Sequence, residues 1–138
     1  HPFGPWEAPR YPAYLLKSWL AGATPSCASP LYVRDNIPVS LLAKAYRRFA
    51  EGLSGQPGFA RFGPSGYVES QGAFTLRVAA EMRPRLGLAC PVELKAQHDF
   101  PEPRVRINTD VLDGRALGWD EAAAWDELAE WYRGGHGA

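Results

Sequence analysis

The stretch AFTLRVAAEM, residues 73–82, decides which fold this chain can adopt. Every second position carries an apolar side chain: Phe74, Leu76, Val78, Ala80 and Met82. Three of the four positions between them are polar or charged. An alternation with a period of two residues is typical of a β-strand with one buried and one exposed face. The stretch therefore predicts a strand.

Neighbouring segments repeat this alternation and predict further strands. GYVES (66–70) precedes the first stretch, and PVELKAQ (91–97) and PRVRIN (103–108) follow it. Gln71-Gly72 suits a hairpin turn, and Pro101-Glu102-Pro103 suits the connection between the last two strands. We therefore expect an antiparallel sheet of three to four strands over about residues 66–108, with one apolar and one polar face.

Three other segments predict helices, at 13–23, 37–53 and 120–133. The second has the clearest apolar stripe, formed by Leu42, Ala45, Tyr46, Phe49 and Leu53. Asp120 and Glu121 suit the start of the third helix, where acidic side chains favour the helix dipole. We expect an α+β fold in which two N-terminal helices and one C-terminal helix cover the apolar face of the antiparallel sheet.

The whole chain, residues 1–138, is predicted to be one domain with an extended, proline- and aromatic-rich arm at 1–12, because four prolines there disfavour a helix or a central strand. A Gly/Pro-rich loop follows the second helix at 54–66. We expect its Phe59 and Phe62 to anchor the loop, since an exposed phenylalanine without a partner is costly.

Composition restricts the partners. Fifteen Lys and Arg balance fifteen Asp and Glu, and zero net charge argues against bulk nucleic acid or an anionic membrane as the main partner. No apolar run reaches the roughly 18 residues of a membrane span. Cys27 and Cys90 lie in apolar surroundings and are expected to be buried, reduced thiols. We expect another protein as partner, no cofactor, and a cytoplasmic location.

The triplet Glu93-Leu94-Lys95 raises the possibility of an enzyme. It resembles the third motif of PD-(D/E)xK nucleases, in which acids bind Mg²⁺ and a lysine assists the reaction. The resemblance implies a second acid nearby, for which Glu81 and Glu69 are the local candidates. The alternative is a solvated strand face, and we favour that interpretation because charged side chains are mostly exposed.

His1 suggests a second alternative. If it is the natural N-terminus, its amine and imidazole resemble part of the copper brace of lytic polysaccharide monooxygenases, with His98 or His136 as a further copper ligand. The Mg²⁺ nuclease and the secreted copper protein are the two alternatives to a chain without catalysis of its own.

Two charged faces make protein binding the favoured prediction. Arg77, Lys95, Arg104 and Arg106 are expected to align on the polar sheet face, and Asp126, Glu127 and Glu130 on the outer face of the last helix. Aromatic side chains do not stand among these arginines, which disfavours single-stranded nucleic acid. We therefore predict a small adaptor or toxin-neutralising, immunity-like protein.

Overall fold

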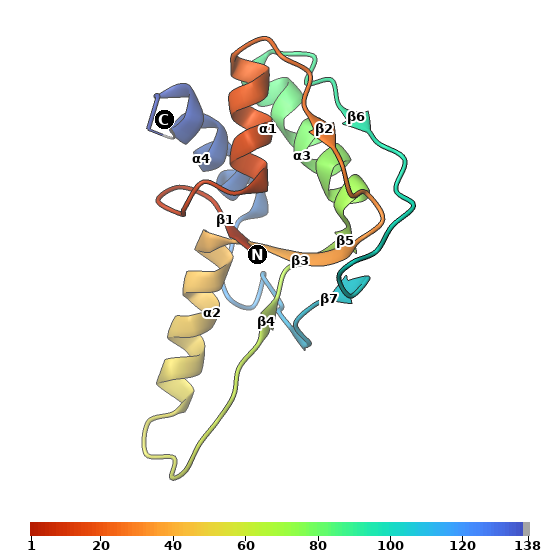
Figure 1. The fold of residues 1–138 in the computed structure, drawn as a ribbon. Coiled ribbons are helices and arrows are strands. Elements are labelled where there is room, and N and C mark those ends of the chain that lie inside the picture. The colour runs from red at the N-terminus through yellow and green to blue at the C-terminus, as the bar shows by residue number, and fades with distance from the viewer. Residues whose placement is uncertain (137–138) are drawn as a thin grey trace.

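The computed structural model describes residues 1–136 and shows an α+β fold (Figure 1). Its helices are α1 (Tyr11–Leu20), α2 (Val39–Gly52), α3 (Gln71–Leu86) and α4 (Glu121–Arg133). Its strands are β1 (Pro2–Phe3), β2 (Ser26–Cys27), β3 (Val33–Pro38), β4 (Pro64–Ser65), β5 (Tyr67–Ser70), β6 (Glu93–Leu94), β7 (Val105–Arg106) and β8 (Asp110–Val111).

Strand β3 is the centre of the main sheet. β5 pairs with one edge of β3 in antiparallel orientation. β7 and β1 share the other edge, both parallel to β3: β7 pairs at Val33 and Arg34, and β1 at Ile37 and Pro38. Two short parallel pairs, β2 with β6 and β4 with β8, complete the strands of the described residues. Four of the five pairings within residues 1–136 are therefore parallel.

The predicted antiparallel sheet over 66–108 is wrong, because the stretch that was to be its first long strand is helix α3. Phe74, Val78 and Met82 are fully buried, and they are four residues apart. A spacing of four satisfies both the strand period of two and the helical i, i+4 pattern. Thr75 and Ala79 are also fully buried, whereas Leu76 is 46% exposed, so the observed burial is helical.

Local signals agree with this helix. Ser70 is the N-cap of α3, and its hydroxyl oxygen accepts a hydrogen bond from the amide of Ala73 at 3.1 Å. Gly87 ends the helix in the left-handed conformation at φ 67°, and its amide donates to the carbonyl of Arg83. Ser at the N-cap and Gly after the last turn are the residues that these positions prefer. The prediction of only two N-terminal helices is corrected accordingly.

The core lies between α1, α3 and α4, which group together on one side of β3 in Figure 1. Its largest buried side chains include Leu15, Leu16 and Trp19 of α1, Phe74 and Met82 of α3, and Trp125 and Leu128 of α4. The indole of Trp19 donates to the carbonyl of Pro91 at 2.8 Å. Cys27 and Cys90 are buried and free, as predicted.

The N-terminal segment is tied to the sheet by β1. Phe3 enters the core at 5% exposure, with its ring 5.4 Å from that of Phe74. Trp6 stays 87% exposed. Helix α1 already begins at Tyr11, inside the predicted arm, because Pro12 lies in its first turn, where its missing N–H is not needed.

Helix α2 has nearly the predicted bounds but projects away from the other helices (Figure 1). Only Leu41 and Ala45 are buried along its length. The chain then returns beside α2 through residues 53–63 to reach β4. Much of the apolar stripe of α2 is therefore not covered by residues 1–136.

Candidate functional site

The N-terminal half of β3 gathers a group of arginine and aromatic side chains, which we call the arginine cluster. Its members are Tyr32, Arg34, Phe100, Glu102, Arg104 and Arg106. The parallel pairing of β3 with β7 creates the cluster, because it sets Arg34 opposite Arg106 and brings the loop before β7 against Tyr32.

Arg34 is the buried centre of the cluster, with a side chain only 6% exposed. Its Nη1 donates to the carbonyls of Val33, Pro103 and Arg104 at 2.9, 3.2 and 3.3 Å. Its Nη2 donates to Oε2 of Glu102 at 3.1 Å. The guanidinium lies 4.3 Å from the ring centre of Tyr32. These contacts satisfy a charge that would otherwise be costly to bury, and they fix the loop before β7.

The other two arginines face solvent. Arg104 lies over Phe100, with its guanidinium 3.8 Å from the ring centre. The ring of Phe100 meets that of Tyr32 edge to face, with centroids 5.7 Å apart. Arg106 has a side chain 57% exposed and reaches Glu102 at 3.6 Å. Arg34 and Arg106 thus share the carboxylate of Glu102, while Arg104 lies over the ring of Phe100. Three arginines stand beside one acidic residue in the cluster, and the excess positive charge suits an anionic ligand.

Asp35 holds the strand that carries this cluster. It is 4% exposed, and its carboxylate accepts hydrogen bonds from the amide of Gly66 at 2.8 Å and the amide of Asn108 at 3.1 Å. These bonds tie β3 to the turn before β5 and to the segment after β7. The register that places Arg34 beside Arg106 is thereby supported from both sides.

The three acids considered for a nuclease lie in three different elements. Glu93 in β6 pairs with Lys95 at 2.6 Å, Glu69 in β5 pairs with Arg77, and Glu81 in α3 pairs with Arg85, the last two at 2.7 Å. Each carboxylate thus lies against a basic side chain near it, as in a surface ion pair. The nuclease stays a prediction that a cleavage assay would test.

The three histidines of the copper hypothesis, His1, His98 and His136, lie on separate segments of the structure. The N-terminal amine of His1 donates a hydrogen bond to the carbonyl of Asp35 at 2.7 Å. Burial of this amine lowers the pKa of the amine from its usual value. His98 belongs to the loop that leads to β7, which pairs with the other half of β3. His136 follows α4, with its ring 5.0 Å from that of Trp131. In the described part of the chain, no group of three or more His, Cys, Asp or Glu side chains could hold a metal ion.

The predicted basic face is divided. Arg104 and Arg106 come together, but Arg77 lies on α3 and Lys95 follows β6. The pKa of Arg77 is raised chiefly by its hydrogen bonds to Glu69.

On the predicted acidic face, Asp126 pairs with Arg85 at 2.6 Å, while Glu127 and Glu130 are exposed on α4. Docking of a protein on either face stays a prediction.

Arg34, Tyr32 and Phe100 were not among the site residues predicted from the sequence. The only local signal was the short extended piece around Tyr32, with an arginine two positions later. The partners of Arg34 in the loop before β7 lie 68 to 70 residues away in sequence, and no spacing pattern links segments that far apart. The fold alone brings them together.

No family model and no curated protein matches this chain. Among solved structures, it is similar to a UDP-N-acetylglucosamine 4-epimerase from Methanobrevibacter ruminantium M1, solved in complex with UDP-N-acetylmuramic acid. The TM-score is 0.58 at 16% identity, and the match covers 98% of this chain and 44% of that chain. The similarity shows a shared fold. It includes nearly all of this chain but less than half of the epimerase chain.

Among residues 1–136, none of the helices combines the length and the apolar character that crossing a membrane requires.

Proposed function

We propose that this chain binds the diphosphate of a nucleotide sugar, as the ligand-binding part of a protein that acts on such compounds. The observation that carries the proposal is the arginine cluster at one end of β3 and β7, in which Arg34 and Arg106 both reach Glu102 and Arg104 lies over Phe100. The similarity in fold to a protein solved with a nucleotide sugar supports it, because the match extends over almost the entire chain.

The chemistry of the cluster fits a diphosphate better than a single carboxylate. A guanidinium offers a planar fork of donors that can bind two phosphate oxygens at once. Arg104 and Arg106 are exposed and supply two such forks, whereas Arg34 is engaged with main-chain carbonyls and positions the loop. Phe100 and Tyr32 add ring surfaces beside the charges. A phosphorylated ligand with a ring system would use both.

Binding is all that we assign to this chain. The match spans 44% of the neighbour's chain, so a reaction on the sugar would also draw on residues outside the matched part. We propose that the cluster orients the ligand and that the chemical step takes place elsewhere in the intact protein.

The test is calorimetric titration of the chain with UDP, UDP-N-acetylglucosamine and uridine. We expect the two diphosphates to bind and uridine to bind much more weakly, because uridine lacks the charged group. Added salt should weaken the binding, as it does for charge-based contacts. Arg104→Ala and Arg106→Ala should each weaken UDP binding about tenfold, corresponding to the loss of one charged hydrogen bond, ~1.5 kcal/mol.

Arg47→Ala is the matched control. Arg47 is an 82% exposed arginine of α2 that pairs with Glu51 and lies outside the cluster. Its removal changes the net charge by the same amount, so UDP should bind this variant as it binds the unaltered chain. Equal affinity of UDP for the Arg104, Arg106 and Arg47 variants, or no binding of either diphosphate at millimolar concentration, would contradict the proposal.

A further inference from the structure

Helix α2 carries an apolar surface that the described part of the chain, residues 1–136, leaves open. The stripe predicted to be its buried face is only partly covered: Ala45 is buried, but Tyr46 is 53% and Leu53 is 42% exposed. A helix with this stripe is stabilised mainly by packing of its apolar face. The uncovered part of α2 therefore indicates a missing neighbour.

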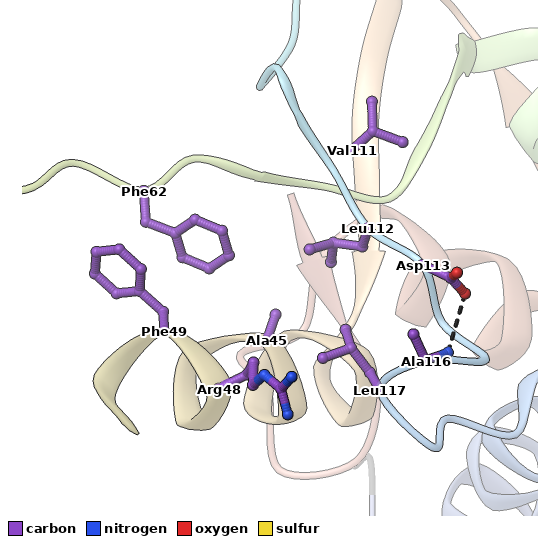
Figure 2. Close-up of a pocket in the computed structure, with 9 residues that line it drawn as sticks. All are labelled: Ala45, Arg48, Phe49, Phe62, Val111, Leu112, Asp113, Ala116 and Leu117. Carbon is purple, nitrogen blue, oxygen red and sulfur yellow. Dashed lines mark hydrogen bonds between the residues drawn. The ribbon is translucent and has the colours of Figure 1, made fainter. Parts of the chain in front are cut away.

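The same side of α2 forms one wall of a cleft of about 350 Å³, shown in Figure 2. The lining residues are Ala45, Arg48, Phe49, Phe62, Val111, Leu112, Asp113, Ala116 and Leu117. Phe49 and Phe62 stack at one end, with ring centroids 4.6 Å apart and planes 11° apart. Val111 is 89% exposed at the opposite wall. Most of this lining is apolar, and Arg48 and Asp113 are its charged members.

The segment 57–62, which returns beside α2, adds a free main-chain edge. Just after it, Gly63 and Asp110 are hydrogen-bonded: the Asp110 amide donates to the Gly63 carbonyl at 3.0 Å. Within residues 1–136, no main-chain hydrogen bond is made by residues 57–62, although they lead directly into β4. Pro57 has no N–H and Gly58 bends the chain at φ 94°, so residues 59–62 are the ones that offer unpaired amides and carbonyls. Such groups are a template for an added strand. Phe59 in this segment is 84% exposed, so it does not anchor the loop on this chain.

The positive charge of Arg48 at the cleft is not paired with an acidic side chain of residues 1–136. Asp113, across the cleft, accepts a hydrogen bond from the amide of Ala116 at 3.0 Å. A partner that fits this cleft would place an acidic side chain near Arg48.

We infer that a second folded unit of the intact protein packs against residues 57–62 and the cleft beside α2, which we call the α2 cleft. That unit pairs an edge strand with residues 57–62, sets apolar side chains on α2 and brings an acid to Arg48. The similarity in fold supports a second unit as the occupant of the cleft, because more than half of the neighbour's chain lies outside the match. In a protein built like that neighbour, the unmatched part would need a surface on the matched part to pack against. The inference rests on the fold and the open surface, and it does not depend on nucleotide-sugar binding.

Hydrogen exchange with mass spectrometry tests the inference on the 138-residue chain and on the complete product of its gene. We expect the amides of residues 58–62 to exchange freely in the 138-residue chain and at least about tenfold more slowly in the complete product. Equal exchange in the two proteins, or a gene product no longer than this chain, would overturn it. A 138-residue chain that dimerises and already protects these amides would assign the cleft to a second copy and also overturn it.

The substitution Val111→Asp tests whether the second unit contacts the cleft without disturbing the fold of the 138-residue chain. Val111 is almost fully exposed, so the 138-residue variant should keep its unfolding midpoint. In the complete product, the buried charge should restore fast exchange at residues 58–62. Leu20→Asp is the control, since Leu20 is also exposed, at 43%, but ends α1. If both variants leave the protection in the complete product intact, the cleft is not the interface.

Discussion

Gly66 shows how closely the segments around β3 approach one another. A Cβ atom at this position would lie 2.5 Å from the carbonyl oxygen of Asn36 and 2.7 Å from the Cα of Ile37. Both are main-chain atoms, which cannot rotate away. The amide of Gly66 also donates to the buried carboxylate of Asp35. The absence of a side chain here is what lets the turn before β5 lie directly against β3.

Gly66→Ala should therefore lower the free energy of unfolding by about 2 kcal/mol or more, the range expected for forcing an extra methyl into a packed site. Urea denaturation measures the loss. Gly52→Ala is the matched control, because nothing lies within 4 Å of a Cβ placed there at the end of α2. A Gly66 variant as stable as the Gly52 variant would show that β3 can move away from the turn.

Helices α3 and α4 each begin at a capping side chain, which depends only on residues close together in the sequence. Ser70 ends β5 and caps α3, and Asp120 caps α4 by accepting from the amide of Ala123 at 3.0 Å. Each cap satisfies an amide that has no partner inside its helix. The cap of α3 also fixes the point where the chain changes from strand to helix, on which the core depends.

Ser70→Ala should cost about 1 kcal/mol of stability, the usual value for an N-cap serine. Thermal or urea unfolding followed by circular dichroism measures it. Ser54→Ala, in the exposed segment after α2, removes the same hydroxyl without removing a cap and should leave stability unchanged. Equal midpoints for the two variants would mean that the cap of α3 contributes nothing.

Across the whole molecule, Tyr67 joins the sheet to the last helix. Its hydroxyl donates to Oε1 of Glu121 at 2.5 Å, at the start of α4. Its ring stacks with that of Trp125 at a centroid distance of 5.8 Å. Burial, with a further effect of the Glu121 contact, raises the pKa of the Tyr67 phenol well above its ordinary value of 10. Burial raises the pKa of Tyr11 and Tyr132 as well.

These raised pKa values predict loss of stability in alkali. Below pH 10 the tyrosines are protonated in both the folded and the unfolded chain, so their contribution is fully present. As pH rises above 10, the unfolded chain loses its phenol protons first, so unfolding becomes more favourable. Urea titrations between pH 8 and 11.5 should show this decline, and Tyr67→Phe should make it shallower. A decline as steep in the Tyr67 variant as in the unaltered chain would refute the assignment.

The sequence supports some elements better than others. Helices α2 and α4 were predicted within a few residues, because the apolar residues of each recur at mixed steps of three and four, and a step of three does not fit the strand period of two. Helix α3 was mistaken for a strand, since its deepest residues, Phe74, Val78 and Met82, fit both periods. The Ser70 cap and the Gly87 stop were local signals that could have corrected that prediction.

Of the candidate site, Arg104 and Arg106 could be found as two basic residues on one strand, but Arg34 could not. Its contacts with Glu102 and Pro103 span 68 and 69 residues. Most strands here are only two residues long, which is too short for a periodic pattern to be recognised.

By itself, the sequence determined the local features of this protein: the starts and ends of α2 and α4, the apolar surroundings of its two thiols, and its balanced charge. These depend on residues that are neighbours along the chain. Only the tertiary structure decided which side chains of 71–86 are buried, that β7 pairs in parallel with β3, that Arg34 lies opposite Arg106, and that part of the stripe of α2 stays open. Those features depend on which distant surfaces exclude water together, and that is settled only when the whole chain packs.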